Sequence, residues 1–143
     1  MCGIAGVIDF RNNKSTTPQL SEQMGNAIRH RGPDAGEIWQ SGNNICGFSH
    51  RRLSIIDLSN AGIQPMSSSD GRYTIVFNGE IYNFQEIKDE LISKGLKFRS
   101  HSDTEVLIEG YRYFGKEIID KLVGMWAFAI WDNVTEELFC CRD

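Results

Sequence analysis

The chain has 143 residues, of which 15 are basic and 19 are acidic, and 41% of its residues are hydrophobic. This length is enough for one domain with a core and short for two. A net charge of −4 without a basic run argues against nucleic acid as a partner. No apolar stretch is long enough to span a membrane, and Asp9 and Arg11 interrupt the first one, so we expect a cytoplasmic chain with no secretory signal.

The first half of the chain predicts a strand at residues 2–10 and a helix that follows Thr17 as N-cap and Pro18 at the first helical position. Leu20, Met24 and Ala27 recur at helical spacing on that helix. Two strands, at 36–40 and 44–50, are joined by the turn 41–44. The Ser-, Asn- and Gly-rich stretch at 57–71 predicts a long loop, which is often functional in a compact domain.

The second half begins with the segment 72–84, in which Asn-Gly between two apolar runs is a strong hairpin signal. Asn83 and Glu86 predict a capping box for a helix that ends at Gly95. We then expect a short strand at 97–100, a helix capped by Ser102 or Asp103, a short helix at 116–122, and strands at 124–132 and 137–143. About eight strands and three or four helices predict a layered α+β domain with mostly antiparallel sheet.

Two of the four cysteines are adjacent, which argues against an ordinary disulfide framework. None is spaced as CxxC, which argues against a zinc site, and we predict no metal. Cys46, Cys140 and Cys141 are expected to be small buried residues. Cys2 has two interpretations. It is a strand residue, or it becomes residue one once Met1 is removed. In that case its α-amino group, with a pKa of about 7.7–8.0, can serve as the base for its own thiol.

Six motifs occur in one order along the chain: MCGIAGV at 1–7, RHRGPD at 29–34, HRRLSIIDLS at 50–59, GIQPM at 62–66, VFNGEIYN at 76–83 and SDTEVL at 102–107. Together they resemble the glutaminase domain of asparagine synthetase B, a class II glutamine amidotransferase of the N-terminal-nucleophile hydrolases. The resemblance implies a four-layer α/β/β/α sandwich. It also implies that residues 1–143 are an amidotransferase domain with its C-terminal strands truncated and the synthetase domain absent.

The resemblance carries roles to individual residues. Cys2 matches the nucleophile that attacks the glutamine side-chain amide and forms a thioester. Asn78 and Gly79 match the oxyanion donors, through a side-chain amide and a backbone N–H. Arg52 matches the residue that binds the glutamine carboxylate. The remaining substrate-binding positions are two acids for the ammonium group and a backbone segment: Glu80, Asp103, Leu53, Ser54, Ile55 and Ile56.

The resemblance also implies a function and its partners. The domain would hydrolyse L-glutamine and supply ammonia to a C-terminal synthetase domain that uses ATP and Mg²⁺ to convert aspartate to asparagine. This domain itself would need no cofactor, and a homodimer is compatible with it. Two alternatives remain open within the family: a catalytically silent glutamine-binding or regulatory module, and an acceptor other than aspartate, such as a sugar carboxylate.

For other residues of the motifs we predict structural roles. Arg31 and Asp34 are expected to hold the loop that closes over the substrate, and His30, His50 and His101 are expected to be structural. A third hypothesis, outside the family, pairs Cys2 with one of these histidines as an ordinary thiol enzyme.

Overall fold

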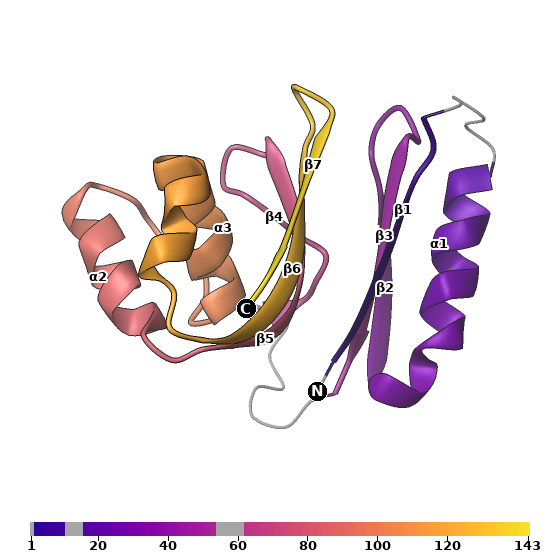
Figure 1. Cartoon of the computed structure of the whole chain (residues 1–143), viewed down its shortest axis with the longest axis horizontal. Helices are drawn as coiled ribbons and strands as arrows, with labels where there is room; N and C mark the ends of the chain where they lie inside the picture. Colours follow the sequence, from indigo (N-terminus) through magenta and orange to yellow (C-terminus); the bar gives the residue numbers. More distant parts are fainter. Residues whose placement is uncertain (1, 11–15, 54–61) are drawn as a thin grey trace.

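The computed structural model describes residues 2–10, 16–53 and 62–143, and these form four layers (Figure 1). Helix α1 covers one face of the sheet β1-β3-β2, and α2 with α3 covers the outer face of the sheet β4-β5-β6-β7. The two sheets face each other in the middle, and all their strand pairs are antiparallel. The predicted α/β/β/α sandwich of antiparallel sheets is confirmed.

The elements in chain order agree with most of the predicted ones. The bounds are β1 Gly3–Ile8, α1 Thr16–Ala27, η1 Arg29–Arg31, β2 Ala35–Gln40, β3 Cys46–Arg52, β4 Met66–Ser67, β5 Tyr73–Ile81, α2 Phe84–Ser93, α3 Asp103–Phe114, η3 Gly115–Lys121, β6 Gly124–Asp132 and β7 Glu137–Arg142. None of the helices in these ranges is long and apolar enough to cross a membrane.

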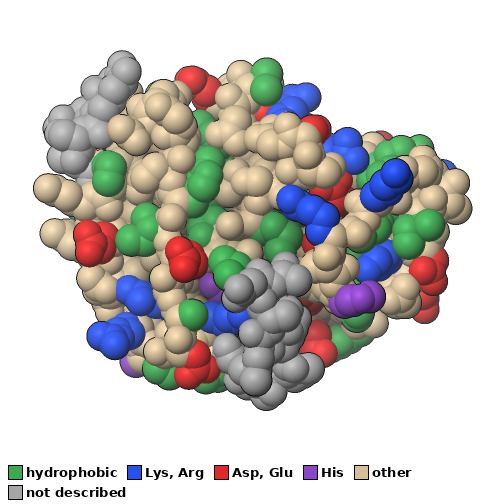
Figure 2. Space-filling model, turned by 180° about the vertical axis from the view of Figure 1, so that it is seen from behind, with side chains coloured by type: hydrophobic (Ala, Val, Ile, Leu, Met, Phe, Trp, Pro, Cys, Tyr) green, Lys and Arg blue, Asp and Glu red, His purple; other side chains and the backbone are tan. Residues whose placement is uncertain are grey.

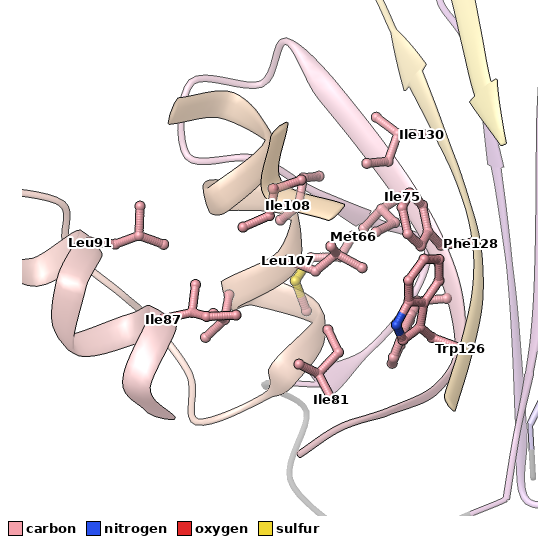
Figure 3. Close-up of a cluster of buried hydrophobic side chains, with 13 residues drawn as sticks. Met66, Ile75, Ile81, Ile87, Leu91, Leu107, Ile108, Trp126, Phe128 and Ile130 are labelled. Carbon is pink, nitrogen blue, oxygen red and sulfur yellow. The ribbon is translucent and has the colours of Figure 1, made fainter. Parts of the chain in front are cut away.

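The main core lies between the second sheet and its helices (Figure 3). Ile87 and Leu91 of α2 and Leu107 of α3 pack against Phe77 of β5 and Phe128 of β6, and all five are buried. Burying a side chain of this size stabilises the fold by about 1.5–3 kcal/mol. A smaller cluster of Cys46, Phe48, Val76 and Trp131 lies between the two sheets.

Helix α1 packs on the sheet with its small polar residues. The sequence pattern, by contrast, predicts that the face with Leu20 and Met24 is buried. Leu20 and Met24 are exposed, whereas Thr17, Ser21 and Gly25 are buried. A Cβ built on Gly25 would lie 3.1 Å from the Ser49 Cβ, so close packing on β3 selects the small face. The helix begins at Thr16, so Thr17 lies in its first turn and is not the N-cap.

The local hairpin signal at Asn78-Gly79 is not realised, because β5 continues through both residues to Ile81. Asn78 pairs with Ala127 and Gly79 with Trp126 along β6. A Cβ on Gly79 would lie 2.6 Å from the Trp126 Cα and would also overlap the Met125 carbonyl oxygen. The glycine therefore allows β6 to approach, and the long-range strand pairing overrides the local turn signal.

Two further local predictions fail because side chains form bonds with distant backbone. The Asn83 side chain makes no cap bond, and it instead donates to Lys121 O at 2.8 Å and accepts from Val123 N at 3.0 Å. Residues 97–100 form no strand, since the Arg99 and Ser100 amides donate to the Glu105 carboxylate at 2.8 and 2.7 Å. The Ser102 cap of α3 is confirmed by its bond from the Glu105 amide.

The four cysteines all lie in the described ranges and none is bridged. Cys46 is buried as predicted, while Cys141 is half-buried and Cys140 is exposed. The burial prediction fails for Cys140 because its strand, β7, is the edge strand of its sheet. In the described part of the chain, β7 pairs with β6 on one side and with no strand on the other.

Candidate functional site

The candidate nucleophile and the candidate carboxylate-binding arginine lie on neighbouring strands of the first sheet. Strands β1 and β3 pair with Gly3 opposite Arg51. Continuing this antiparallel register by one residue sets Cys2 opposite Arg52. Paired residues of an antiparallel sheet project to the same face, so both side chains face the second sheet, as Phe48 of β3 does. Cys2 and Arg52 are both half-buried.

The RHRGPD motif holds the backbone of these two residues. The Arg31 guanidinium donates through Nε to Cys2 O at 3.3 Å, and the Asp34 amide donates to Arg52 O at 3.2 Å. Between them, Gly32 packs on the β3 backbone so closely that a Cβ would lie 2.6 Å from the Arg52 N. The motif therefore positions the backbone of Cys2 and Arg52, and its expected role in holding a loop over the substrate stays a prediction.

Strand β5 of the second sheet presents the candidate oxyanion donors to the same space. Val76 points into the cluster between the sheets, and Phe77 points into the helix-side core. Because side chains alternate along a strand, Asn78 projects toward the first sheet, as Val76 does. Strand β5 also contacts β1 across the gap. Cys2 and Asn78 therefore occupy facing surfaces of the two sheets.

Asp103 at the start of α3 forms the acidic side of the site. Its carboxylate accepts from the Ile81 amide at 3.2 Å, which fixes it beside the end of β5. Burial raises the pKa of Asp103 above its usual value, the bonds from Ile81 and Thr104 oppose this rise, and the nearby charge of Glu80 adds to it. Two carboxylates close enough to interact favour a cation between them.

The guanidinium of Arg52 reaches toward this acidic side. A Cβ built on Gly62 would lie 3.9 Å from Arg52 Nη2 and 4.0 Å from the Cβ of Ser102, the residue before Asp103. The Arg52 guanidinium and the N-terminus of α3, the helix that carries Asp103, thus both lie close to Gly62. This arrangement suits the two charged ends of a free α-amino acid.

Gln64 is a site-supporting residue that we did not predict. It is buried, its Oε1 accepts from the Phe77 amide at 2.6 Å, and its Nε2 donates to Thr104 Oγ1 at 3.2 Å. Gln64 therefore links Phe77, which precedes Asn78, to Thr104, which follows Asp103. The GIQPM motif is the signal that could have found it.

The other predicted binding positions divide between the described and undescribed parts. Leu53 directly follows β3 beside Arg52 and is half-buried. Ser54, Ile55 and Ile56 lie outside the described residues, as does Met1. Within the described ranges, no group of three or more His, Cys, Asp or Glu side chains is placed to hold a metal ion.

The histidines bear on the hypothesis of a Cys-His pair. His30 and His101 are exposed, and only His50 lies in the sheet, opposite Ile4 and on the same face as Cys2. His50 is 3% exposed. Burial and, to a lesser extent, the charge of Arg52 together lower its pKa to about 4. An imidazole with this pKa is a weak base at neutral pH.

The glutamine amidotransferase domain family matches residues 1–143, and the chain belongs to this family. Its fold is also that of a solved glutamine phosphoribosylpyrophosphate amidotransferase from Bacillus subtilis, with a TM-score of 0.73 and 20% identity over 99% of this chain and 36% of that one. The resemblance drawn from the six motifs is therefore confirmed at the level of family and fold.

Among individual proteins, the chain is 46% identical over its full length to asparagine synthetase [glutamine-hydrolyzing] 1 of Bacillus subtilis. It is 37% identical over its full length to asparagine synthetase B of Escherichia coli and, likewise, to the amidase chry2 of Gibberella zeae. The chain spans 22%, 25% and 22% of the lengths of these three relatives.

Proposed function

We propose that this chain hydrolyses glutamine to glutamate and ammonia, with Cys2 as an N-terminal nucleophile after Met1 is removed. The observation that carries the proposal is the convergence of Cys2, Arg52, Asn78 and Asp103, from four different parts of the sequence, on one end of the space between the sheets. Membership of the amidotransferase domain family supports it.

The charges of the site support one orientation of glutamine. Its carboxylate would bind the fork of Arg52, and its ammonium group would bind Asp103 with Glu80. The side-chain amide would then extend between the sheets toward Cys2 and Asn78. Leu53 and the segment 54–56 would line the substrate on the Arg52 side.

The proposed reaction needs only groups of this chain. The α-amine of Cys2 takes the thiol proton, and the sulfur attacks the amide carbon of glutamine. The Asn78 side-chain amide and the Gly79 N–H stabilise the resulting oxyanion. The C–N bond breaks as the amine returns the proton to the departing ammonia. Water then attacks the thioester, which releases glutamate and restores the thiol.

We further propose that the ammonia serves a C-terminal synthetase domain that makes asparagine from aspartate with ATP and Mg²⁺, in a cytoplasmic protein. The names of the Bacillus and Escherichia relatives, and the greater length of both, support this part. The described residues of this chain offer no cluster of ligands that fits Mg²⁺, so no step above passes through the metal. The amidase name of the Gibberella relative supports an alternative acceptor as the second candidate.

A labelling experiment tests the glutaminase. The purified chain is treated with a glutamine-analogue electrophile and digested for mass spectrometry. We expect one adduct on Cys2 in molecules that lack Met1, and glutamate release that Cys2→Ala abolishes. Cys141→Ala is the matched control and should keep both. Adducts elsewhere in Met1-free chains would refute the nucleophile, and glutamine binding without glutamate release would indicate the silent module.

His50→Gln decides between the base of this proposal and the Cys-His hypothesis. A Cys-His pair with His50 as the proton acceptor predicts loss of glutamate release, and His30→Gln and His101→Gln test the other two histidines in the same way. The α-amine mechanism predicts that turnover continues with an unchanged alkaline limb of its pH profile.

A further inference from the structure

A second hollow lies between α2 and the segment 96–101, which leads into Ser102 and Asp103 of the candidate glutamine site. Its volume is about 450 Å³ and its lining is Lys88, Ile92, Leu96, Lys97, Phe98, Arg99, Ser100 and His101. These include two lysines, an arginine and a histidine but no acidic residue, although the chain as a whole is acidic. It shares no residue with the site described above.

Lys88 is the buried cation of this hollow. Its side chain comes from α2 and is 7% exposed. The ammonium donates to Ser100 O at 2.9 Å and lies 5.1 Å from the centroid of the Phe98 ring. An ammonium group has three donors. In the described part of the chain, one carbonyl and one aromatic face are therefore its only recorded partners.

Other buried charged side chains of the described ranges form ion pairs. Glu105 pairs with Arg99 at 3.4 Å, Glu109 with Arg112 at 2.7 Å, and Asp132 with Arg72 at 2.7 Å. Lys88 has no such carboxylate partner among the described residues. A buried charge that lacks a counter-ion destabilises a protein strongly, so an anion that entered the hollow would meet a group already placed for it.

The remaining lining residues define the chemistry of the anion. Lys97 and His101 are exposed at the rim, and Arg99 divides its guanidinium between Glu105 and Ser67 O. Lys and Arg side chains appear at the surface of the half of the molecule that contains α2 and α3 (Figure 2). Ile92 and Phe98 add apolar surface beside the charges. The volume falls within the range of about 300–1,000 Å³ that is usual for small-molecule sites.

We propose that this basic hollow binds a small phosphomonoester. Its phosphoryl group would bind Lys88 and Lys97, and its organic part would pack on Phe98 and Ile92. A phosphoryl group supplies three acceptor oxygens and up to two negative charges, which suits an ammonium with unused donors. The proposal does not depend on the glutaminase activity, since no residue is shared.

Phenyl phosphate is the probe, because it combines the phosphoryl group with a ring that fits against Phe98. The chain labelled with ¹⁵N is titrated with phenyl phosphate, and with phenol as the uncharged control, while amide shifts are followed by NMR. We expect saturable shifts at residues 96–101 with phenyl phosphate and none with phenol. Lys88→Gln should weaken binding by about tenfold or more, the effect of losing a charged hydrogen bond.

Lys94→Gln is the matched control, because Lys94 caps the same helix but lies over the Tyr113 ring and outside the hollow. It should bind phenyl phosphate as the unaltered chain does. If Lys88→Gln fails to fold, Lys97→Gln takes its place with an expected loss of several-fold. Equal binding by the Lys88 and Lys94 variants, or shifts spread over other surface lysines, would overturn the proposal. A response to hexaglutamate but not to phenyl phosphate would overturn it too, and would assign the hollow to an acidic protein segment.

Discussion

Gly79→Ala is the substitution for which the structure gives the clearest expectation. A Cβ at this position would lie 2.6 Å from the Trp126 Cα and would overlap the Met125 carbonyl. Both contacts are with the backbone of β6, which cannot yield as a flexible side chain would. Overpacking of this kind costs about 1–3 kcal/mol. For a chain of this size that corresponds to roughly 2–4 °C of melting temperature per kcal/mol.

An alanine at position 79 would push β5 and β6 apart, and this movement should affect glutamine hydrolysis more strongly than the stability of the fold. Separating β5 from β6 displaces the Gly79 N–H and the adjacent Asn78 side chain, which are the proposed oxyanion donors. Loss of one such donor typically lowers kcat by about 10²–10³-fold. Both effects are measured on one preparation, by thermal denaturation followed by circular dichroism and by glutamate release at saturating glutamine.

Gly42→Ala is the matched control for this prediction. Gly42 lies in the turn between β2 and β3, and a Cβ there would have no heavy atom within 4 Å. We expect its melting temperature and kcat to stay near those of the unaltered chain. If Gly79→Ala also left both unchanged, β6 would not constrain Gly79 and the oxyanion assignment would lose its structural basis.

The remaining predictions concern charges. Arg52→Lys should raise the KM for glutamine by about 10–150-fold with little change in kcat, since a lysine cannot form the two-pronged carboxylate contact; an unchanged KM would contradict the role of Arg52. Asp103→Asn should raise the same KM but leave the melting temperature at pH 7 equal or higher. Because the pKa of Asp103 is raised in the fold, its ionised carboxylate destabilises the folded state above pH 3.8, and the uncharged asparagine side chain removes this cost. A lower melting temperature of the variant at pH 7 would contradict the prediction. The bonds from Arg72, together with those from Val134 and Thr135 and against the effect of burial, lower the pKa of Asp132 from 3.8 to about 2, so the stability they contribute is present above pH 3.8 and is lost between these values. Arg72→Gln should therefore shift the midpoint of acid unfolding to higher pH. If the variant and the unaltered chain unfolded at the same pH, the contribution of the Arg72–Asp132 bonds to stability would be refuted.

The sequence alone was sufficient for the architecture and for the identity of the candidate residues. Apolar runs and turn signals placed most strands and helices, because burial along one face leaves a period that can be read locally. The six motifs indicated the family, and with it Cys2, Arg52, Asn78, Gly79 and Asp103. The removal of Met1 and the roles of Ser54, Ile55 and Ile56 stay predictions.

Only the tertiary structure decided which local signals were realised. Asn78-Gly79 is part of a continuous strand, and the Asn83 side chain bonds the distant backbone of Lys121 and Val123 instead of capping α2, because partners distant in sequence offer better pairing and packing. The same holds for α1, where the close approach of β3 at Gly25 buried Ser21 and left Leu20 exposed. The bonds from the RHRGPD motif to Cys2 and Arg52, and the buried Lys88 in a basic hollow, depend on contacts between segments that no local pattern specifies.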